Sequence, residues 1–487
     1  MSLTIAWSLL AAAVAAGEPS GGPGSLYDVA DQRQLLVDNA FFAQASRVRL
    51  RLHPAQKTDE KVLVAQWPWE SATLNWFNVI ADPGVVDRRA RYRMWYECYD
   101  VAGWDTGDDT SFCYAESRDG IHWSKPALGL FEYQGSQKNN ILFRQIGQGS
   151  GRSRVHGTGV FRDPTAPPEA RYKAVSQGIW GDRTPPHRIA GMFSPDGLRW
   201  TRYAQPICDV FADSQFSCFW DSGLKKYVLY GRAEGGVGRA ESSDFSHFEP
   251  LRPLLTTDQR DPPDSSLYNP AALMYAGAAH LYLMFPSLYQ HRPQTLDIRL
   301  AASRDGIHWT WPQQDAALVP LGPADSKTLY LGQGLIRAGD EMWLYYSGSP
   351  LRHNEAEFDN LKKLRAPRTF RRVVLGRDRF VSADAGRDGG YFVTPPLRFT
   401  GAVLRLNVET CPGGSVRVGL LNEDGQAIPG RGVADCLPVT GDQLDAVVRW
   451  KSGSDVSGRA GRPTRMRLEL IDASLYGFEF ARNGGQK

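Results

Sequence analysis

Short runs of apolar and aromatic residues, each ended by Gly, Pro, Asp or Ser, recur along most of the chain. Examples are YRMWYECYD (92–100), KYVLYGR (226–232) and HLYLMFPS (280–287). Short runs rich in aromatic and β-branched residues predict strands rather than helices. The hydrophobic pattern therefore predicts an all-β chain of many short strands joined by tight turns.

One short phrase follows several sets of these strands. It reads SRDGIHW at 117–123, SPDGLRW at 194–200, SSDFSHF at 242–248, SRDGIHW at 303–309 and, in altered form, GRDRFVS at 376–382. Each set predicts one four-stranded antiparallel blade, and a radial array of blades protects strand edges that an open sheet exposes. The repeat predicts a five-bladed β-propeller.

The Asp-Gly pair of this phrase is typical of a turn, and its aromatic residue is typical of packing between blades. We therefore interpret Asp119, Asp196, Asp244 and Asp305 as structural residues and not as catalytic ones. The phrase is similar to the Asp-box of sialidases but lacks that motif's residue between Asp and Gly.

The pattern divides the chain into four segments. Residues 1–20 contain an apolar run with a small-residue end and predict a secretory signal peptide. Residues 25–73 lead into the propeller, which we expect over 74–386. Residues 390–482 alternate apolar and polar positions without the repeated phrase, which predicts a C-terminal β-sandwich; bracing of the propeller is the preferred role, and recognition of sugar is the alternative.

Composition narrows the possible partners and the compartment. The net charge of the 487 residues is only +3, and no stripe of Lys and Arg suggests nucleic acid. No apolar stretch is long enough to span a bilayer comfortably, so we expect a secreted or periplasmic protein without a membrane span. Six cysteines, an even number, favour local disulfides, with unpaired thiols as the alternative. The sequence does not determine the oligomeric state.

Propeller topology assigns the unusual polar and aromatic residues to one face. The starts of the first strands and the loops between second and third strands open there, and long loops on one face of a rigid scaffold typically form a binding site. The residues near strand starts are Trp69, Glu70, Asn75, His156, Asp213, Tyr268, Asn269 and Tyr330. The loop residues are Glu97, Asp100, Arg183, Arg232, Glu234, Tyr289, Arg352 and His353.

The chain resembles the five-bladed propeller glycoside hydrolases of families 32, 43 and 130, and in particular secreted bacterial proteins of a family-32-like type. The segments that carry the resemblance are LLVDNAFF, WPWE, YRMWYECYD, residues 114–142 and LYLGQGLIRAGDEMWLYYSG. The resemblance implies a glycosidase acting on a carbohydrate, with carboxylates drawn from blades one, two and three around the axis. Hydrolysis of a sugar acetal needs one carboxylate as nucleophile or base and another as acid.

Mapped by position, the resemblance assigns the nucleophile or base to Glu70 and the acid to Asp213, with the roles exchangeable. Glu234, Glu97 and Asp100 are reserves. The family-32 signature Asn-Asp-Pro-Asn-Gly is absent, so fructan specificity is not inferred. No cofactor or metal is expected; the acidic loop 105–109 could bind Ca²⁺, but a solvated loop is the preferred interpretation.

Two other functions stay open. One is a carbohydrate-binding propeller without catalysis. The other is a lyase or sialidase-like enzyme that uses a Tyr or His base beside Arg, for which Tyr268, Tyr330, His156 and Arg232 are available. Arg183, Arg232 and Arg352 could then hold an anionic sugar.

Overall fold

The chain is nearly all β over the residues that the computed structural model describes. These are residues 26–82, 90–101, 109–148, 151–278, 280–354 and 368–482, with only the backbone described for 145–148 and 151–154. They contain strands and short 3-10 turns but no α-helix, and so hold no helix long and apolar enough to cross a membrane. The predicted signal peptide and most of the acidic loop 105–109 lie outside the described residues.

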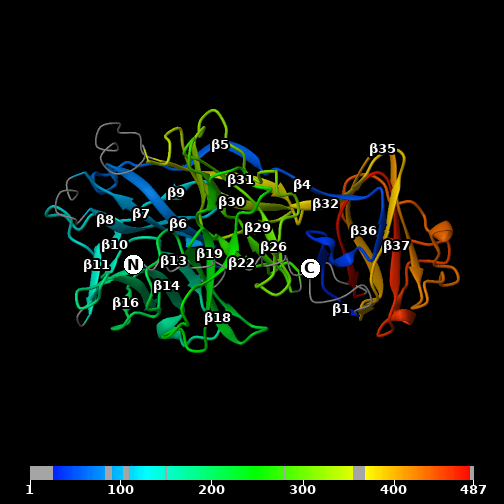
Figure 1. The fold of residues 1–487 in the computed structure, drawn as a ribbon, viewed down its shortest axis with the longest axis horizontal. Helices are drawn as coiled ribbons and strands as arrows, with labels where there is room; N and C mark the ends of the chain where they lie inside the picture. Colours follow the sequence, from blue (N-terminus) through cyan, green and yellow to red (C-terminus); the bar gives the residue numbers. More distant parts are fainter. Residues whose placement is uncertain are drawn as a thin grey trace, which may run out of the picture.

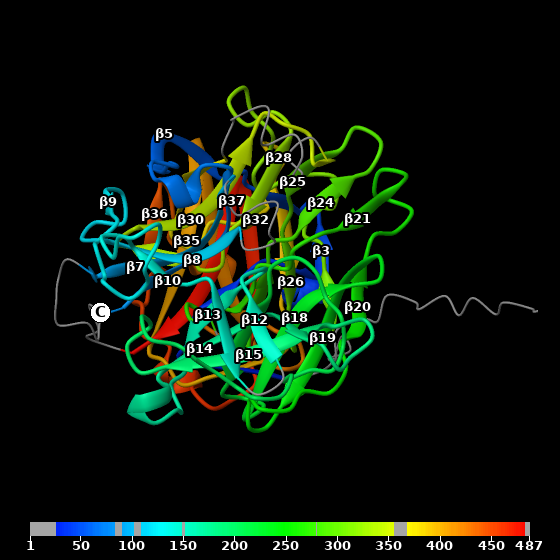
Figure 2. The same cartoon turned by 90° about the vertical axis from the view of Figure 1, so that its left-hand side faces the viewer.

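Four antiparallel sheets are arranged around a common centre, as in a propeller (Figure 2). Their central strands lie side by side, since β6 contacts β13, β13 contacts β17 and β17 contacts β22. These strands are β6 (Thr73–Ala81), β13 (Gly159–Arg162), β17 (Ser217–Asp221) and β22 (Ala272–Met274).

The outer strands of the four sheets follow each central strand along the chain, as the sequence predicts, except that β11 (Gln145–Gln148) and β12 (Gly151–Arg154) of the second sheet precede β13. The first sheet continues with β7 (Tyr92–Tyr99), β8 (Thr110–Ser117), β9 (Trp123–Ser124) and β10 (Ile141–Phe143), and the second with β14 (Tyr172–Trp180), β15 (His187–Ser194) and β16 (Thr201–Arg202). The third continues with β18 (Lys226–Ala233), β19 (Gly236–Ser242) and β20 (Arg252–Thr256), and the fourth with β23 (Tyr282–Met284), β26 (Ala301–Ser303) and β27 (Trp309–Thr310).

A larger eight-stranded sheet lies between the fourth sheet and the first. Its strands include β28 (Thr328–Leu331), β29 (Ile336–Ala338), β30 (Glu341–Ser349), β31 (Thr369–Gly376) and β5 (Gln56–Leu63). β29 contacts β6 of the first sheet, which closes the circle. β31 pairs with β30 on one edge and with β5 on the other, and β5 comes from the lead-in segment, far away in the sequence.

The fifth copy of the repeated phrase does not form the strand that the repeat predicts. Residues 381–385 form β32 (Val381–Ala385), which pairs with β4 (Arg49–Leu52) and with β37 (Arg465–Ala481) of the C-terminal sheet. The position beside β31 is already filled by β5, so the chain leaves the propeller-like part here.

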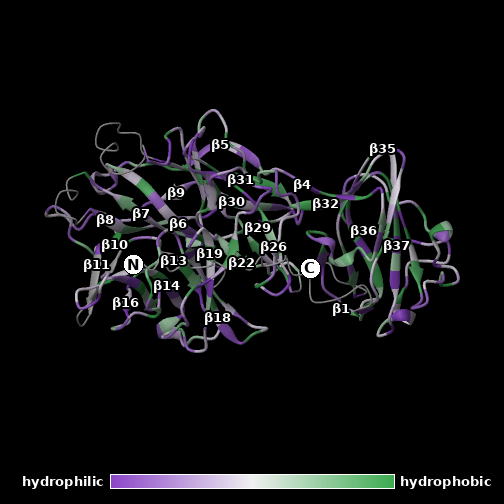
Figure 3. Cartoon of the chain, viewed as in Figure 1, coloured by the Kyte–Doolittle hydropathy of each residue, from purple (hydrophilic) through white to green (hydrophobic). Residues whose placement is uncertain are grey.

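The C-terminal residues form a separate sheet with a hydrophobic core of its own, beside the propeller-like part (Figure 1). Two long strands, β35 (Val403–Leu421) and β37, pair along most of their lengths. Hydrophobic and hydrophilic residues alternate along β37 (Figure 3), and its buried side chains include Leu468, Leu470 and Phe478. The lead-in also contributes strands to this sheet and so joins it to the propeller-like part.

The Asp-Gly phrase forms the turn that the sequence predicts. Asp119 Oδ1 accepts hydrogen bonds from the backbone N–H groups of Ile121 and His122, each at 2.8 Å, and Gly120 has a φ of 76°. The same carboxylate-to-backbone bonds recur at Asp196, Asp244 and Asp305. The structural interpretation of these aspartates is confirmed.

These turns also hold neighbouring sheets together. Trp95 Nε1 of the first sheet donates to the carbonyl of Gly197 in the second at 2.6 Å. Tyr230 of the third sheet donates to the carbonyl of Gly306 in the fourth at 2.7 Å, and Tyr345 of the eight-stranded sheet donates to that of Gly120 in the first at 2.9 Å. Each of these three turns therefore receives an aromatic side chain from the sheet before it.

The predicted disulfides are wrong, because all six cysteines are free thiols. Cys98 and Cys113 come within 3.5 Å (Sγ to Sγ) on adjacent strands. They are not directly opposite, since Cys98 faces Ser111 and Cys113 faces Tyr96 in the ladder. Cys411 is exposed while Cys436 is buried.

Candidate functional site

A cluster of polar and aromatic side chains lies where the central strands of the sheets begin. His156 and Asp213 precede β13 and β17, and Asn75 lies near the start of β6. Backbone bonds between neighbouring sheets fix these segments, as Phe216 N–H donates to the carbonyl of Gly157 at 2.9 Å. The Asp-Gly turns lie at the opposite strand ends, so the cluster and the turns occupy different faces.

A continuous chain of contacts links the polar members. Asn75 Nδ2 donates to the hydroxyl of Tyr99 at 3.1 Å, and this hydroxyl lies 3.1 Å from Nδ1 of His156. His156 Nε2 lies 2.7 Å from Asp213 Oδ1, and Arg232 NH1 lies 3.3 Å from Asp213 Oδ2. Residues of the second and third sheets therefore contact the carboxylate of Asp213, and the first sheet is linked to it through His156.

Asp213 is held as a carboxylate and keeps contact with solvent. Burial on its own raises its pKa, but the hydrogen bond and charge of His156, the backbone N–H of Ser214 and the charge of Arg232 together hold the pKa of Asp213 well below its usual range. Its side chain is 37% exposed. Ser214 has a φ of 77°, a strained value for serine that directs its N–H to Asp213 Oδ1 at 2.7 Å. The group suits the role of base or nucleophile and not that of a proton donor.

An aromatic wall adjoins Asp213. Arg232 lies over the ring of Tyr268, with 4.2 Å from its guanidinium carbon to the ring centroid, and Arg368 lies over the ring of Tyr330 at 4.8 Å. Tyr330 OH lies 2.6 Å from Nδ1 of His353. Burial, together with the charges of Arg368 and Arg232, lowers the pKa of His353 to about 4, so it is neutral at neutral pH.

Tyr289 completes this wall, with its ring 4.7 Å from that of His353. Arg368 also joins the wall to the polar chain, because its NH1 donates to Asn75 Oδ1 at 2.8 Å. The cluster thus combines ring faces, two guanidinium groups and one ionised carboxylate.

A second carboxyl group, Glu97, lies buried beside the cluster. Its Oε1 accepts the N–H of Thr158 at 2.7 Å, while Oε2 has no hydrogen-bond partner among the described residues. Burial raises the pKa of Glu97, and the nearby charge of His156 acts in the opposite direction. Glu97 is fully buried, so a substrate does not touch it directly in this conformation.

Glu70 lies outside the cluster, in a buried ion pair of the first sheet. It ends the short turn η2 (Pro68–Glu70), and Lys125 Nζ contacts both of its carboxylate oxygens at 2.7 and 2.8 Å. The N–H of Gln66 donates at 2.7 Å and the hydroxyl of Tyr96 at 2.6 Å. The WPWE segment folds back so that the carboxylate accepts these donors, and Glu70 and Asp213 are not brought together.

Trp69 and Asp100 also have structural surroundings in the first sheet. Trp69 Nε1 donates to Asn140 Oδ1 at 3.1 Å, and Asp100 lies 2.9 Å from a guanidinium nitrogen of Arg144. Both residues are buried.

Four further residues of the predicted site lie in different surroundings. Glu234 is exposed at the turn between β18 and β19, and Arg183 forms a surface ion pair with Asp209 at 2.7 Å. Asn269 is fully buried and donates to the carbonyl of Leu331. Arg352 is exposed and immediately precedes His353.

Tyr99, Arg368 and Trp76 belong to the cluster but are missing from the predicted site. Trp76 stacks near Tyr268, with 6.2 Å between ring centroids. The sequence could have indicated Tyr99 as a site residue, because it ends β7 beside the predicted loop. The sequence could not have indicated Arg368, since its contact to Asn75 joins residues 293 positions apart.

The described residues hold no group of three or more His, Cys, Asp or Glu side chains suited to a metal ion. Most of the acidic loop 105–109 lies outside them. The cluster itself offers one exposed carboxylate, whose lone pairs face His156, Ser214 and Arg232.

Comparisons with known proteins find solved structures of similar fold and two curated proteins that match part of the sequence. No family model matches the sequence. An uncharacterized protein of Mycobacterium tuberculosis is 28% identical over 167 residues, which are 32% of this chain and 47% of that protein. The chain therefore matches about half the length of the curated relatives.

Solved structures similar to this chain include glycoside hydrolases and related enzymes. A glycosyl hydrolase from Bacteroides ovatus has a TM-score of 0.47 at 14% identity and covers 69% of this chain and 97% of its own. An N-acetylgalactosamine deacetylase from F. plautii has a TM-score of 0.46 at 13% identity, with coverages of 69% and 97%. Fructofuranosidase from Schwanniomyces occidentalis has a TM-score of 0.42 at 11% identity, with coverages of 88% and 97%. At such values the likeness says nothing about individual residues or the reaction.

Proposed function

We propose that this chain is a carbohydrate-active enzyme that cleaves glycosidic bonds at the cluster around Asp213. The observation that carries the proposal is the partly exposed carboxylate of Asp213, kept ionised by His156 and Arg232 beside an aromatic wall. An oxocarbenium-like transition state needs an anionic base or nucleophile, and sugar rings pack well on aromatic faces. The sequence resemblance to propeller glycoside hydrolases supports the same class of reaction.

In this proposal Asp213 is the base or nucleophile, which exchanges the role first assigned to it. Its lowered pKa makes it a poor acid at neutral pH. The proton donor is Glu97, whose raised pKa favours the protonated form. Because Glu97 is fully buried, this role requires that substrate binding open the site to its carboxyl group, from which the proton passes to the leaving oxygen.

We further propose that the eight-stranded sheet supplies the fifth blade of a five-bladed propeller, with β29, β30, β31 and β5 as its strands. The pairing of β5 with β31 and the contact of β29 with β6 support this. Residues 390–482 are proposed as a β-sandwich that braces the propeller. The apolar run within 1–20 supports a secreted or periplasmic location.

A second candidate is an enzyme for anionic sugars that works through Tyr, His and Arg. It is favoured by one observation, the two guanidinium groups of Arg232 and Arg368 stacked on Tyr268 and Tyr330 within the cluster. Guanidinium groups bind carboxylates and sulfates in a bidentate manner. A third candidate, a binding propeller without catalysis, keeps the aromatic wall but makes no use of Asp213.

One experiment separates these candidates. Wild type, Asp213→Asn and Arg368→Gln are assayed on matched neutral and uronic-acid oligosaccharides. The primary proposal predicts turnover of a neutral substrate that Asp213→Asn abolishes and Arg368→Gln reduces less. Turnover confined to uronides and lost in Arg368→Gln favours the second candidate, and binding without turnover favours the third.

A further inference from the structure

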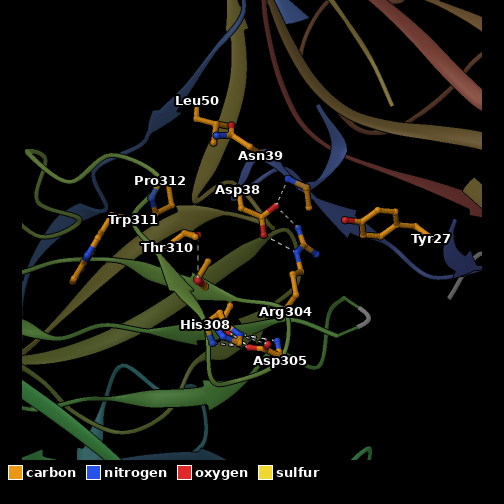
Figure 4. A pocket seen from close by; sticks show the side chains of 13 residues that line it. Tyr27, Asp38, Asn39, Leu50, Arg304, Asp305, His308, Thr310, Trp311 and Pro312 are labelled. Carbon is orange, nitrogen blue, oxygen red and sulfur yellow. Dashed lines mark hydrogen bonds and ion pairs between the residues drawn. The ribbon is translucent and has the colours of Figure 1, made fainter. Parts of the chain in front are cut away.

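A cavity lies between the propeller-like part and the lead-in residues that pack on the C-terminal sheet (Figure 4). Its volume is about 400 Å³, within the range of small-ligand pockets. One side is formed by the fourth Asp-Gly turn, at the opposite ends of the strands from Asp213. The cavity is therefore distinct from the cluster around Asp213.

Each apolar wall of this cavity is anchored on a different hydrophobic core. Trp311 packs against the core shared by the third and fourth sheets, and Leu50 packs against the core shared by the fourth sheet, the eight-stranded sheet and the lead-in. Tyr27 packs against the core of the C-terminal sheet, where its ring lies 5.8 Å from that of Phe41. All three lining side chains are only partly buried. The cavity is therefore preformed, with rigid ring faces that remain available to a ligand.

The polar and charged groups in the cavity contact one another. Arg304 Nε donates to Asp38 Oδ2 at 2.8 Å, and its NH2 donates to Asp38 Oδ1 at 3.2 Å and to the carbonyl of Leu35 at 2.8 Å. His308 Nδ1 lies 2.7 Å from Asp305 Oδ2. These bonds do not use Arg304 NH1 or His308 Nε2. With two carboxylates and one guanidinium, the cavity does not favour an anion, and it offers hydrogen-bonding groups between ring faces.

We propose that this cavity is a second carbohydrate site that binds one neutral sugar unit. A sugar ring has an apolar C–H face that packs on Trp311, at one end of the cavity, and its equatorial hydroxyls both donate and accept, which matches the polar groups that lie between Trp311 and Tyr27 (Figure 4). A second site on the same chain strengthens attachment to a polymer by raising the effective concentration of sugar. The proposal holds whether or not the Asp213 cluster hydrolyses a substrate.

The chain contains a matched internal control for this site. The heptapeptide SRDGIHW occurs at both 117–123 and 303–309, and His122 contacts Asp119 at 2.8 Å as His308 contacts Asp305. Only the second copy lines the cavity. His308→Ala and His122→Ala therefore remove the same local bond at two turns, and only one of them removes a cavity group.

The test is isothermal titration of the full chain with glucose, galactose, mannose, xylose, cellobiose and lactose. We expect saturable millimolar binding of at least one probe that Asp213→Asn leaves unchanged. His308→Ala and Trp311→Ala are expected to weaken it at least fivefold, and His122→Ala to leave it within a factor of two. Four results overturn the proposal: no saturable binding of any probe, loss of binding in Asp213→Asn, retention of binding in both His308→Ala and Trp311→Ala, or equal weakening by both histidine variants.

Discussion

Replacing Glu70 by glutamine tests whether this residue is structural, as its surroundings indicate, or catalytic, as the sequence resemblance implies. The side chain of Lys125 is only 6% exposed and that of Glu70 is fully buried, and the ammonium contacts both carboxylate oxygens. The Glu70→Gln substitution keeps the shape of the side chain but removes its charge. Lys125 is then a buried cation without a counter-charge, and its other bond is to the carbonyl of Val64 at 2.8 Å.

The expected loss of stability follows from the loss of this ion pair. Removing one partner of a buried ion pair costs about 3–5 kcal/mol, because the other charge stays desolvated and unpaired. The amide nitrogen of the introduced glutamine also meets a donor, either the ammonium or the N–H of Gln66, which adds an unsatisfied contact of about 1–3 kcal/mol. The two costs overlap, since the amide oxygen still accepts one of these donors. We expect Glu70→Gln to lower the free energy of unfolding of the propeller-like part by about 3–5 kcal/mol.

The assay is urea unfolding followed by tryptophan fluorescence, with turnover measured below the transition. The double variant Glu70→Gln/Lys125→Met removes both charges and is expected to regain most of the lost stability. Lys125→Met alone is expected to be destabilised as well. The reasoning is refuted if Glu70→Gln unfolds at the wild-type urea concentration yet loses all turnover, since that pattern belongs to a residue of the reaction.

Three further predictions concern pH, turns and the Asp213 contacts. In the folded protein the pKa of His353 is lowered to about 4, so as pH falls the unfolded chain binds this proton before the folded chain does. The stability that is present above about pH 6.5 is therefore lost as pH falls towards 4, by at most about 3 kcal/mol. His353→Gln is expected to flatten this part of the curve of stability against pH, and an unchanged curve contradicts the argument. Gly197→Ala places a Cβ 2.7 Å from the Trp95 ring at a φ of 75°, whereas Gly425→Ala has a similarly positive φ but no atom near its Cβ. Unfolding midpoints are expected to show Gly197→Ala less stable than Gly425→Ala by ~1–3 kcal/mol, because only the first substitution meets a packed ring. Equal midpoints refute this packing argument. The folded pKa of Asp213 is lowered, so its contribution is present above its unfolded pKa of about 3.9 and lost as pH falls below it; wild type is expected to lose more stability than Asp213→Asn between about pH 5 and pH 2, which acid unfolding measures.

Local sequence signals predicted much of the fold. The strands of the first four sheets and the Asp-Gly turns depend on neighbouring residues, as in the bonds from Asp119 to residues two and three positions later. The strand beside β31 was not predictable in this way. β5 pairs with it across a long separation in the chain, as Phe370 faces Leu63, and nothing in the sequence of β5 names that partner.

The site was predictable as far as topology determines position. His156, Asp213 and Arg232 were predicted because strand starts and hairpin ends of adjacent sheets meet at one face, and the structure brings them together. Glu70 was assigned on the same basis, but its partner Lys125 lies 55 positions away and removes it from the cluster. Side-chain partners over such separations depend on packing that the strand pattern does not specify.

The central claim is that the carboxylate of Asp213 performs the chemistry on a glycosidic bond. The most direct test is turnover of a panel of polysaccharides and aryl glycosides by wild type and Asp213→Asn, with thermal unfolding measured in parallel. The account predicts that wild type hydrolyses at least one neutral glycoside and that the variant is slower by about 10²–10⁴-fold or more at an unchanged unfolding midpoint. Equal turnover by the two proteins would contradict it.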